Sequence, residues 1–171
     1  MFSRSKDRVA KAVSECVAKQ NKQIDLRGSI FRKMNELPPD IAKLTSVTAC
    51  DLSMNHIPSL PNEIGEMMNL EVLSLDYNEL KELNAAVCQL KMLRKLSVRG
   101  NKLVSLPESI SNLTLLEELD VRDNALVELP LAIGLFYTYG HGNDSNNERR
   151  EKREGKRSDG EGTTSGKSSN E

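Results

Sequence analysis

The sequence predicts an α/β solenoid, a stack of similar coils, from three periodic features. Asparagines recur every 23 residues, hydrophobic residues keep a constant phase around each asparagine, and prolines recur in the segment that follows. Self-similarity at a period of roughly 20 to 50 residues is typical of repeat architectures, in which each copy packs only on its neighbours. The asparagines in register are Asn55, Asn78, Asn101 and Asn124.

The hydrophobic columns predict one short strand in each copy. In Leu96-Ser97-Val98 the alternation has a period of two, so Leu96 and Val98 point to one side and Ser97 to the other. So short a strand cannot bury its apolar face alone, and the copies must therefore stack and share one core. The columns before the asparagines are Val47-Cys50-Leu52, Leu70-Leu73-Leu75, Leu93-Leu96-Val98 and Leu116-Leu119-Val121.

The recurring asparagines are interpreted as a structural ladder rather than as ligand-binding residues. The chain must turn after each strand, and the turn leaves backbone groups that neither a helix nor a sheet satisfies. An Asn side chain carries one acceptor and two donors, so it can bond the backbone of its own turn and of the neighbouring turn.

The segment that returns to the next strand is predicted to be extended or a 3₁₀-helix. Pro61, Pro107 and Pro130 recur there, with Pro38 in the same place one copy earlier. Proline lacks an N–H and fixes φ, which disfavours a regular α-helix in every copy. One copy has Asn84 in place of proline, and a short helix over residues 85–90 is expected there.

These motifs resemble those of a known family. The stretch Leu93-Arg-Lys-Leu96-Ser-Val98-Arg-Gly-Asn101-Lys-Leu103 resembles the LxxLxLxxNxL signature of leucine-rich repeats. Its continuation, from Leu106-Pro107 to Leu113, resembles the LPxxIxxL ending of the subclass that includes Ras-suppressor and Ras-pathway scaffold proteins. The resemblance covers about residues 24 to 136. It implies a right-handed superhelix with short parallel strands on a concave face, which binds a protein partner.

An amphipathic helix is predicted to cap the N-terminal end of the array, within residues 1–23. Over about residues 5 to 21, apolar or uncharged residues recur at spacings of three and four, among charged residues. Ser3 or Ser5 could cap its start. The alternative is a basic membrane-surface or mitochondrial-targeting helix, against which Asp7 and Glu15 argue. The predicted buried face comprises Val9, Val13, Cys16, Val17 and Gln20.

The array is predicted to span residues 24–139, as one degenerate and four regular 23-residue repeats. The degenerate copy has its strand at residues 24–26, its turn at residues 34–38 and three extra residues; Arg32 stands where a ladder asparagine would be. Residues 140–171 carry charge but almost nothing apolar, and they are expected to be disordered. Either Phe136, Tyr137 and Tyr139 close the last coil, or that end is partly exposed, as in a shortened form of a longer repeat protein.

The predicted binding surface lies on the concave face, between the core columns. Outward positions there form acidic, basic and mixed bands, and interface hot spots favour Tyr and Arg. The alternative is a solvated face whose charges form intramolecular ion pairs, such as Asp76 with Arg99. The candidate partner-binding residues are Asp51, Met54, Asp76, Tyr77, Arg99, Asp120 and Arg122.

The predicted function is a non-enzymatic protein-interaction module, and the resemblance suggests a scaffold that binds a small GTPase or its regulator. The alternatives are a regulatory or structural subunit that assembles through its uncapped C-terminal end, and a truncated isoform with little function of its own. A net charge of −1 and the lack of a continuous basic stripe argue against nucleic-acid binding. The lack of a phosphate-binding loop or another catalytic motif argues against a bound cofactor and against catalysis. Three dispersed cysteines indicate neither disulfides nor a metal site, so a cytoplasmic protein is expected. It is expected to be monomeric unless its C-terminal end self-associates.

Overall fold

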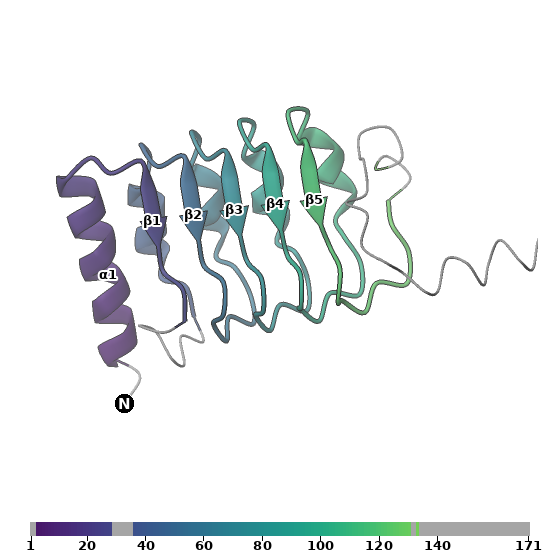
Figure 1. Ribbon diagram of the computed structural model, residues 1–171, viewed down its shortest axis with the longest axis horizontal. Helices are drawn as coiled ribbons and strands as arrows, with labels where there is room; N and C mark the ends of the chain where they lie inside the picture. Colours follow the sequence, from purple (N-terminus) through teal and green to yellow (C-terminus); the bar gives the residue numbers. More distant parts are fainter. Residues whose placement is uncertain (1–2, 29–35, 131–132, 134–171) are drawn as a thin grey trace, which may run out of the picture. The chain divides into compact units, whose positions relative to one another are not determined.

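The computed structural model describes residues 3–28, 36–130 and 133. One N-terminal helix is followed by five short strands that form a single parallel sheet in chain order. The strands make one layer and short 3₁₀-helices lie behind it (Figure 1). The predicted leucine-rich-repeat type of solenoid is therefore confirmed. The elements are α1 (Ser3–Ala18), β1 (Gln23–Asp25), η1 (Pro39–Lys43), β2 (Ala49–Asp51), η2 (Asn62–Glu66), β3 (Val72–Ser74), η3 (Ala85–Gln89), β4 (Lys95–Ser97), η4 (Glu108–Asn112) and β5 (Glu118–Asp120).

The strand register follows the repeat of the sequence. Cys50 pairs with Leu73, Leu73 with Leu96, and Leu96 with Leu119, so each step advances 23 residues. The step from β1 to β2 pairs Ile24 with Cys50 and so takes 26 residues. The three extra residues predicted for the first copy therefore lie between these strands and leave the sheet register intact.

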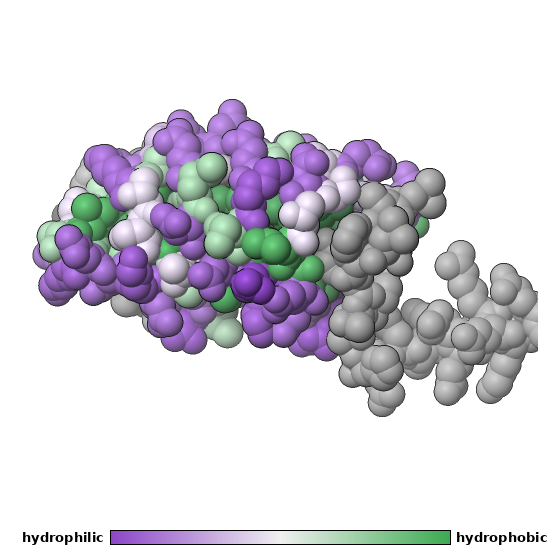
Figure 2. All heavy atoms as spheres, turned by 90° about the horizontal axis from the view of Figure 1, so that it is seen from above, coloured by the Kyte–Doolittle hydropathy of each residue, from purple (hydrophilic) through white to green (hydrophobic). Residues whose placement is uncertain are grey.

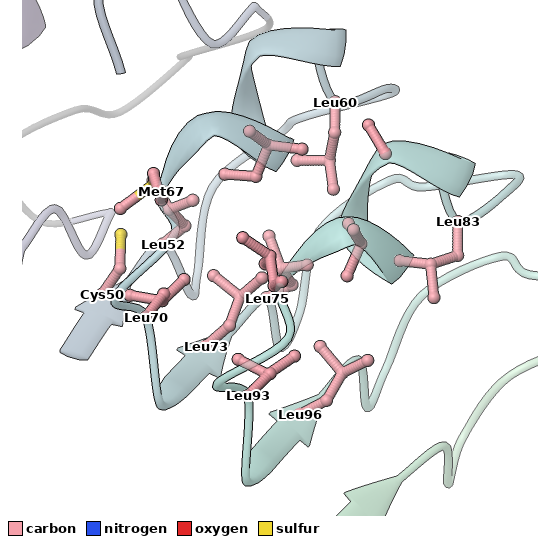
Figure 3. Close-up of a cluster of buried hydrophobic side chains, with 14 of the residues drawn as sticks. Cys50, Leu52, Leu60, Met67, Leu70, Leu73, Leu75, Leu83, Leu93 and Leu96 are labelled. Atoms are coloured by element: carbon pink, nitrogen blue, oxygen red, sulfur yellow. The ribbon is translucent and has the colours of Figure 1, made fainter. Parts of the chain in front are cut away.

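The core lies between the sheet and the 3₁₀-helices (Figure 3). The middle residue of each strand from β1 to β4 is buried, and the apolar residues of the turns and 3₁₀-helices pack against it. Burying one Leu or Ile side chain contributes about 1.5–3 kcal/mol, so the shared spine supplies most of the favourable free energy. The residues labelled in Figure 3 are Cys50, Leu52, Leu60, Met67, Leu70, Leu73, Leu75, Leu83, Leu93 and Leu96.

The return segments are 3₁₀-helices, as predicted from the prolines. Pro38, Pro61 and Pro107 each stand directly before such a helix, in extended conformation. Asn84 takes the place of proline before η3, and its side-chain oxygen accepts a hydrogen bond from the N–H of Ala86. Asn84 also donates to the carbonyl of Leu60 at 2.8 Å, which ties η3 to the preceding coil. The copy without proline therefore has the same 3₁₀-helix as the others.

Helix α1 packs on β1 and η1 at the N-terminal end of the array. Val9, Val13 and Cys16 are buried, as predicted from their spacing. Val17 is 43% exposed and Gln20 is also exposed, so these two were wrongly assigned to the buried face. The helix ends at Ala18, and Gln20 adopts a left-handed conformation with φ of 51°, which turns the chain toward β1. Among the described residues, no helix is long and apolar enough to cross a bilayer.

The recurring asparagines connect successive coils. The side-chain N–H groups of Asn78 donate to the carbonyl of Leu75 in its own coil and to that of Leu52 in the preceding coil, both at 3.0 Å. Its side-chain oxygen accepts the N–H of Ile57 at 3.1 Å. Asn101 and Asn124 repeat this pattern one and two coils further on. Asn55 donates to the carbonyls of Leu26 and Leu52 at 2.9 Å.

The last coil is less covered than the coils before it. Leu119, Val121 and Asn124 are only partly buried, whereas Leu96 and Val98 in the preceding copy are fully buried. The first four coils are each covered by a following coil that belongs to the described residues. Met34, Arg32, Phe136, Tyr137, Tyr139 and residues 140–171, about which the sequence made predictions, lie outside those residues.

Candidate functional site

The outward side chains of β1–β5, with those directly before and after each strand, form one continuous surface, called the strand face here. Alternation along each strand buries the middle residue and turns its two neighbours outward. From β2 onward, equivalent outward positions recur every 23 residues on adjacent strands. The short strands and their buried neighbours hold this surface in place, so its chemistry depends on the outward residues alone.

On the β4–β5 part of the strand face, the charges are paired with one another. Lys95 Nζ lies 2.6 Å from Glu118 Oε1, Arg99 Nε lies 2.8 Å from Asp123 Oδ2, and Arg94 pairs with Glu117. Arg122 contacts both carboxylate oxygens of Asp120. These carboxylates and cations largely neutralise one another, which leaves little unsatisfied charge for a partner.

The electrostatics of this part agree with its geometry. The hydrogen bond from Arg122 lowers the pKa of Asp120, and the hydrogen bond to Asp123 raises the pKa of Arg99. The ion pair proposed between Asp76 and the guanidinium of Arg99 is not formed. Asp76 Oδ1 instead accepts the backbone N–H of Arg99 at 2.9 Å and the hydroxyl of Ser97. The side chain of Arg99 turns toward the following coil because Asp123 lies there.

On the β1–β3 part, carboxylates outnumber the cations that could pair with them. Asp25 holds the guanidinium of Arg27 with contacts of 2.5–3.0 Å, while Asp51 Oδ2 lies 3.4 Å from Arg27 Nε. Within the described chain, no ion pair engages Glu71 or Asp76. This part of the strand face therefore keeps negative charge that neighbouring side chains do not neutralise.

A shallow hollow opens on the strand face between β1, β2 and β3, with a volume of about 310 Å³. Ala49 and Val72 occupy equivalent outward positions on β2 and β3, where β4 and β5 carry Lys95 and Glu118. Val72 is 37% exposed, a large fraction for an aliphatic side chain on a rigid strand. We call this feature the β1–β3 hollow; it is lined by Gln23, Ile24, Asp25, Ala49, Cys50, Asp51, Val72 and Ser74.

Bulky residues adopt a left-handed backbone conformation beside the strand face. The residue before each ladder asparagine has positive φ: 58° at Met54, 54° at Tyr77, 66° at Gly100 and 57° at Asp123. This conformation costs an L-residue about 1–2 kcal/mol, and glycine normally relieves that cost. Met54 and Tyr77 nevertheless occupy the position, and they are 64% and 46% exposed. The conformation recurs in all four coils and so belongs to the turn of the repeat; at Met54 and Tyr77 this turn presents an apolar side chain to solvent.

The ring of Tyr77 is held by its neighbours in the next coil. A Cβ on Gly100 would lie 2.5 Å from the ring, so the ring rests on a bare stretch of backbone that only glycine provides. The guanidinium of Arg99 lies 5.9 Å from the ring centroid, within the range of a cation–π contact. Tyr77 is therefore both exposed and restrained, as an interface anchor requires.

The structure divides the predicted site residues into two groups. Asp51, Met54, Asp76 and Tyr77 lie beside the β1–β3 hollow or along the adjacent turn. Arg99, Asp120 and Arg122 belong to the paired network of β4–β5, and the guanidinium of Arg99 also lies over the ring of Tyr77. Sequence reasoning missed Ala49 and Val72 as site residues. The sequence did contain an indication of their role: both are apolar at an outward position where the next two copies carry a charged residue.

A different exposed apolar row lies where the strands begin. Met68, Met92 and Leu115 precede β3, β4 and β5, and each is more than a third exposed. Seen from that end, the surface is mostly hydrophilic and its hydrophobic residues form separate spots (Figure 2). None of these three residues lines the β1–β3 hollow.

The cysteines and His56 show no arrangement for catalysis. Cys16, Cys50 and Cys88 are buried, and burial raises the pKa of each thiol, which keeps it protonated. His56 Nδ1 lies 2.9 Å from Glu79 Oε1, in a surface row that continues to Lys102. Over the described residues, no three metal-ligating side chains gather at one point.

The repeats match a family model described as a leucine-rich repeat region, over residues 24–129. The chain belongs to the leucine-rich-repeat family. The match is to the family as a whole, and the proposed LPxxIxxL subclass stays a prediction. Leucine-rich-repeat proteins generally mediate protein–protein interaction and are typically non-enzymatic. Among curated proteins, no sequence relative matches the chain.

Solved leucine-rich-repeat structures resemble this chain over part of their length. A leucine-rich-repeat protein of Leptospira interrogans is 35% identical, with a TM-score of 0.57 over 59% of this chain and 26% of that protein. The plant peptide hormone receptor RGFR1, solved in complex with RGF2, is 32% identical, with a TM-score of 0.51 over 58% of this chain and 17% of the receptor. The repeat domain of the type III effector XopL, 23% identical, has a TM-score of 0.68 over 78% of this chain and 47% of that domain. The chain thus spans about a quarter or less of the first two proteins.

Proposed function

We propose that this protein is a non-enzymatic interaction module that binds a protein partner on the β1–β3 part of its strand face. One observation carries the proposal: Val72, Met54 and Tyr77 expose large apolar side chains from a strand and from turns whose backbone is hydrogen-bonded to the next coil. Their counterparts on β4 and β5 are charged or glycine. Interface cores favour aromatic residues and Met and exclude paired charges, so the centre of the site lies at β2–β3.

The plant receptor supports a peptide or protein ligand for this surface. Its repeats are 32% identical to those of this chain, and it is a peptide hormone receptor solved with RGF2. The predicted partner class remains a small GTPase or one of its regulators, a proposal that rests on the LPxxIxxL resemblance. The proposed scaffold role rests on the same resemblance. The proposed cytoplasmic location rests instead on the dispersed free cysteines, and a monomer is proposed unless the C-terminal end self-associates.

The test is a binding assay with immobilised wild-type protein and a panel of purified small GTPases, their regulators and unrelated proteins. Val72→Glu and Tyr77→Ala should each weaken capture of a true partner by at least about tenfold, the effect of losing one hot spot. Val104→Glu is the matched control, because Val104 is 53% exposed and lies outside the strand face. A partner that binds Val72→Glu and Tyr77→Ala as well as wild type would contradict the proposed site.

A second candidate function is assembly through the C-terminal end of the array. Leu119, Leu126 and Leu129 are only partly buried, whereas Leu96, Leu103 and Leu106 one copy earlier are buried. An end of this kind can accept a further coil from another chain. Light scattering over a hundredfold range of concentration tests it: a rising mass that Leu126→Lys abolishes would support assembly, and a constant monomer mass would exclude it.

A further inference from the structure

We infer that the β1–β3 hollow receives an extended peptide segment that carries one aliphatic side chain and basic side chains two and four residues from it. The inference rests on the proposed function and adds the chemistry of the partner. It depends on three features of the strand face: the hollow itself, the unneutralised carboxylates around it, and their spacing along β3.

The hollow fits a side chain better than a free ligand. Its volume of about 310 Å³ lies at the lower limit for small-molecule pockets. Among the residues that line it, Ala49 and Val72 have aliphatic side chains that offer no hydrogen bond. An aliphatic side chain seated there would bury apolar surface on both partners, which favours binding.

The carboxylates around the hollow give the charge of the occupant. Asp51 lines the hollow and shares Arg27 with Asp25, while Glu71 and Asp76 precede and follow β3 and form no ion pair within the described chain. A basic partner would supply the missing countercharge. An acidic segment would meet three carboxylates at close range and would be repelled.

The spacing along β3 gives the pattern of the occupant. Ala49 is in register with Val72, and Asp51 is in register with Ser74, two residues further along the strand. Asp76 follows after two more residues. An extended segment advances about 3.3–3.4 Å per residue, so its alternate side chains are about 7 Å apart on one side. An aliphatic residue over Val72 therefore places basic residues two and four positions away near Asp51 and Asp76.

The β4–β5 part of the strand face does not offer these features. Lys95 and Glu118 fill the positions equivalent to Val72, and they are bonded to each other. A basic segment placed there would have to break ion pairs that are already formed. The inferred segment is therefore directed to β1–β3 alone.

The test uses the full-length protein and a synthetic nonapeptide, acetylated and amidated, of sequence RSRSLSRSR. Its central leucine is flanked by arginine at the second and fourth positions on each side, so either chain direction presents the inferred pattern. Fluorescence anisotropy at low and at high salt compares it with a peptide whose centre is serine and with one whose arginines are glutamate. The leucine peptide should bind at least about fivefold more tightly than the serine peptide, the expected contribution of one buried aliphatic group. The glutamate peptide should show no binding.

Variants locate the site on the protein. Glu71→Lys should weaken binding of the leucine peptide by about tenfold, because it replaces a carboxylate next to Val72 with a positive charge that repels the arginines. Glu63→Lys is the matched control, with the same charge change in η2 on the opposite side of the array. Val72→Ser should make the leucine and serine peptides bind equally well. Binding of both peptides should still weaken as salt is added, because the carboxylates remain.

Equal binding of the leucine and serine peptides, or equal effects of Glu71→Lys and Glu63→Lys, would overturn the inferred chemistry. The proposed function would survive that result if a natural partner still lost affinity for Val72→Glu and Tyr77→Ala. If a natural partner also ignored those two changes, the proposed site itself would be wrong.

Discussion

The interior coils and the last coil of this solenoid share one sequence pattern and differ in what covers them. Leu96, Val98 and Asn101 in the coil of β4 are buried, whereas Leu119, Val121 and Asn124 at the same positions in the coil of β5 are half-buried. Both asparagines form the same set of hydrogen bonds. The comparison indicates that the core and ladder residues of a coil become buried when the next coil packs on it. The proposed binding site at β2 and β3 lies within that covered part.

The largest expected effect is on core leucines. Leu96→Ala should lower the free energy of unfolding by about 2–5 kcal/mol, through lost burial and the cavity that remains. Leu119→Ala should cost about half of that or less, because water already reaches this side chain. Urea unfolding followed by circular dichroism measures both under the same conditions. Equal losses would remove the difference between interior and last coils.

The next effect concerns the asparagine ladder. Asn101→Ala should cost about 1–3 kcal/mol, since it leaves the N–H of Leu80 and the carbonyls of Leu75 and Val98 buried without this partner. Asn124→Ala should cost less, because Asn124 is only half-buried and water can take the place of its side chain. Chemical unfolding of the pair tests this order. A larger loss at Asn124 would show that the last coil is covered as fully as the others.

A smaller effect is expected at the left-handed turns. Gly100→Ala should destabilise the protein by about 1–2 kcal/mol, because the backbone conformation disfavours a Cβ and the ring of Tyr77 occupies its space. Asp123 occupies the same position in the last coil and already carries a Cβ in the left-handed conformation. Asp123→Ala should therefore lower the free energy of unfolding by less than about 1 kcal/mol. Thermal unfolding compares the two. The double variant Gly100→Ala, Tyr77→Ala should regain part of the stability lost in Gly100→Ala, because the ring no longer meets the new Cβ. If no stability is regained, the contact between the ring and Gly100 is contradicted.

The smallest effect is expected from the surface pair that joins the two coils. Lys95 and Glu118 are largely exposed, so a double-mutant cycle with Lys95→Ala and Glu118→Ala should give a coupling of about 0–1 kcal/mol. The coupling should fall as salt is added, because exposed charges are screened. A coupling that is large and independent of salt would mean that the pair is shielded from solvent.

The fold could be predicted because the residues that form it repeat. Leu and Asn columns have a single period, and packing and hydrogen bonding force equivalent residues into equivalent places, as Leu73, Leu96 and Asn101 show. The three extra residues of the first copy could also be predicted, from the longer spacing between its leucines, and the step of 26 residues from Ile24 to Cys50 agrees with them. Val17 was placed on the wrong face of α1 because spacing alone does not show where a helix meets its neighbour.

The candidate site was harder to predict from the sequence, because the outward residues differ from copy to copy. Whether Arg99 turns to Asp76 or to Asp123 depends on rotamers in a neighbouring coil, and no spacing rule determines that choice. The left-handed turn at Tyr77 could have been found, since Gly100 occupies its column one copy later. The hollow at Ala49 and Val72 requires two strands in register, which becomes evident once the sheet is assembled.

The central claim is that each coil is completed by the coil that follows it, and native-state hydrogen exchange tests this most directly. The N–H of Val98 donates to the carbonyl of Asp120 on β5 at 2.9 Å, whereas the equivalent N–H of Val121 has no acceptor among the described residues. The N–H of Val98 should exchange at least about a hundredfold more slowly than that of Val121. Equal protection of the two amides would contradict the claim.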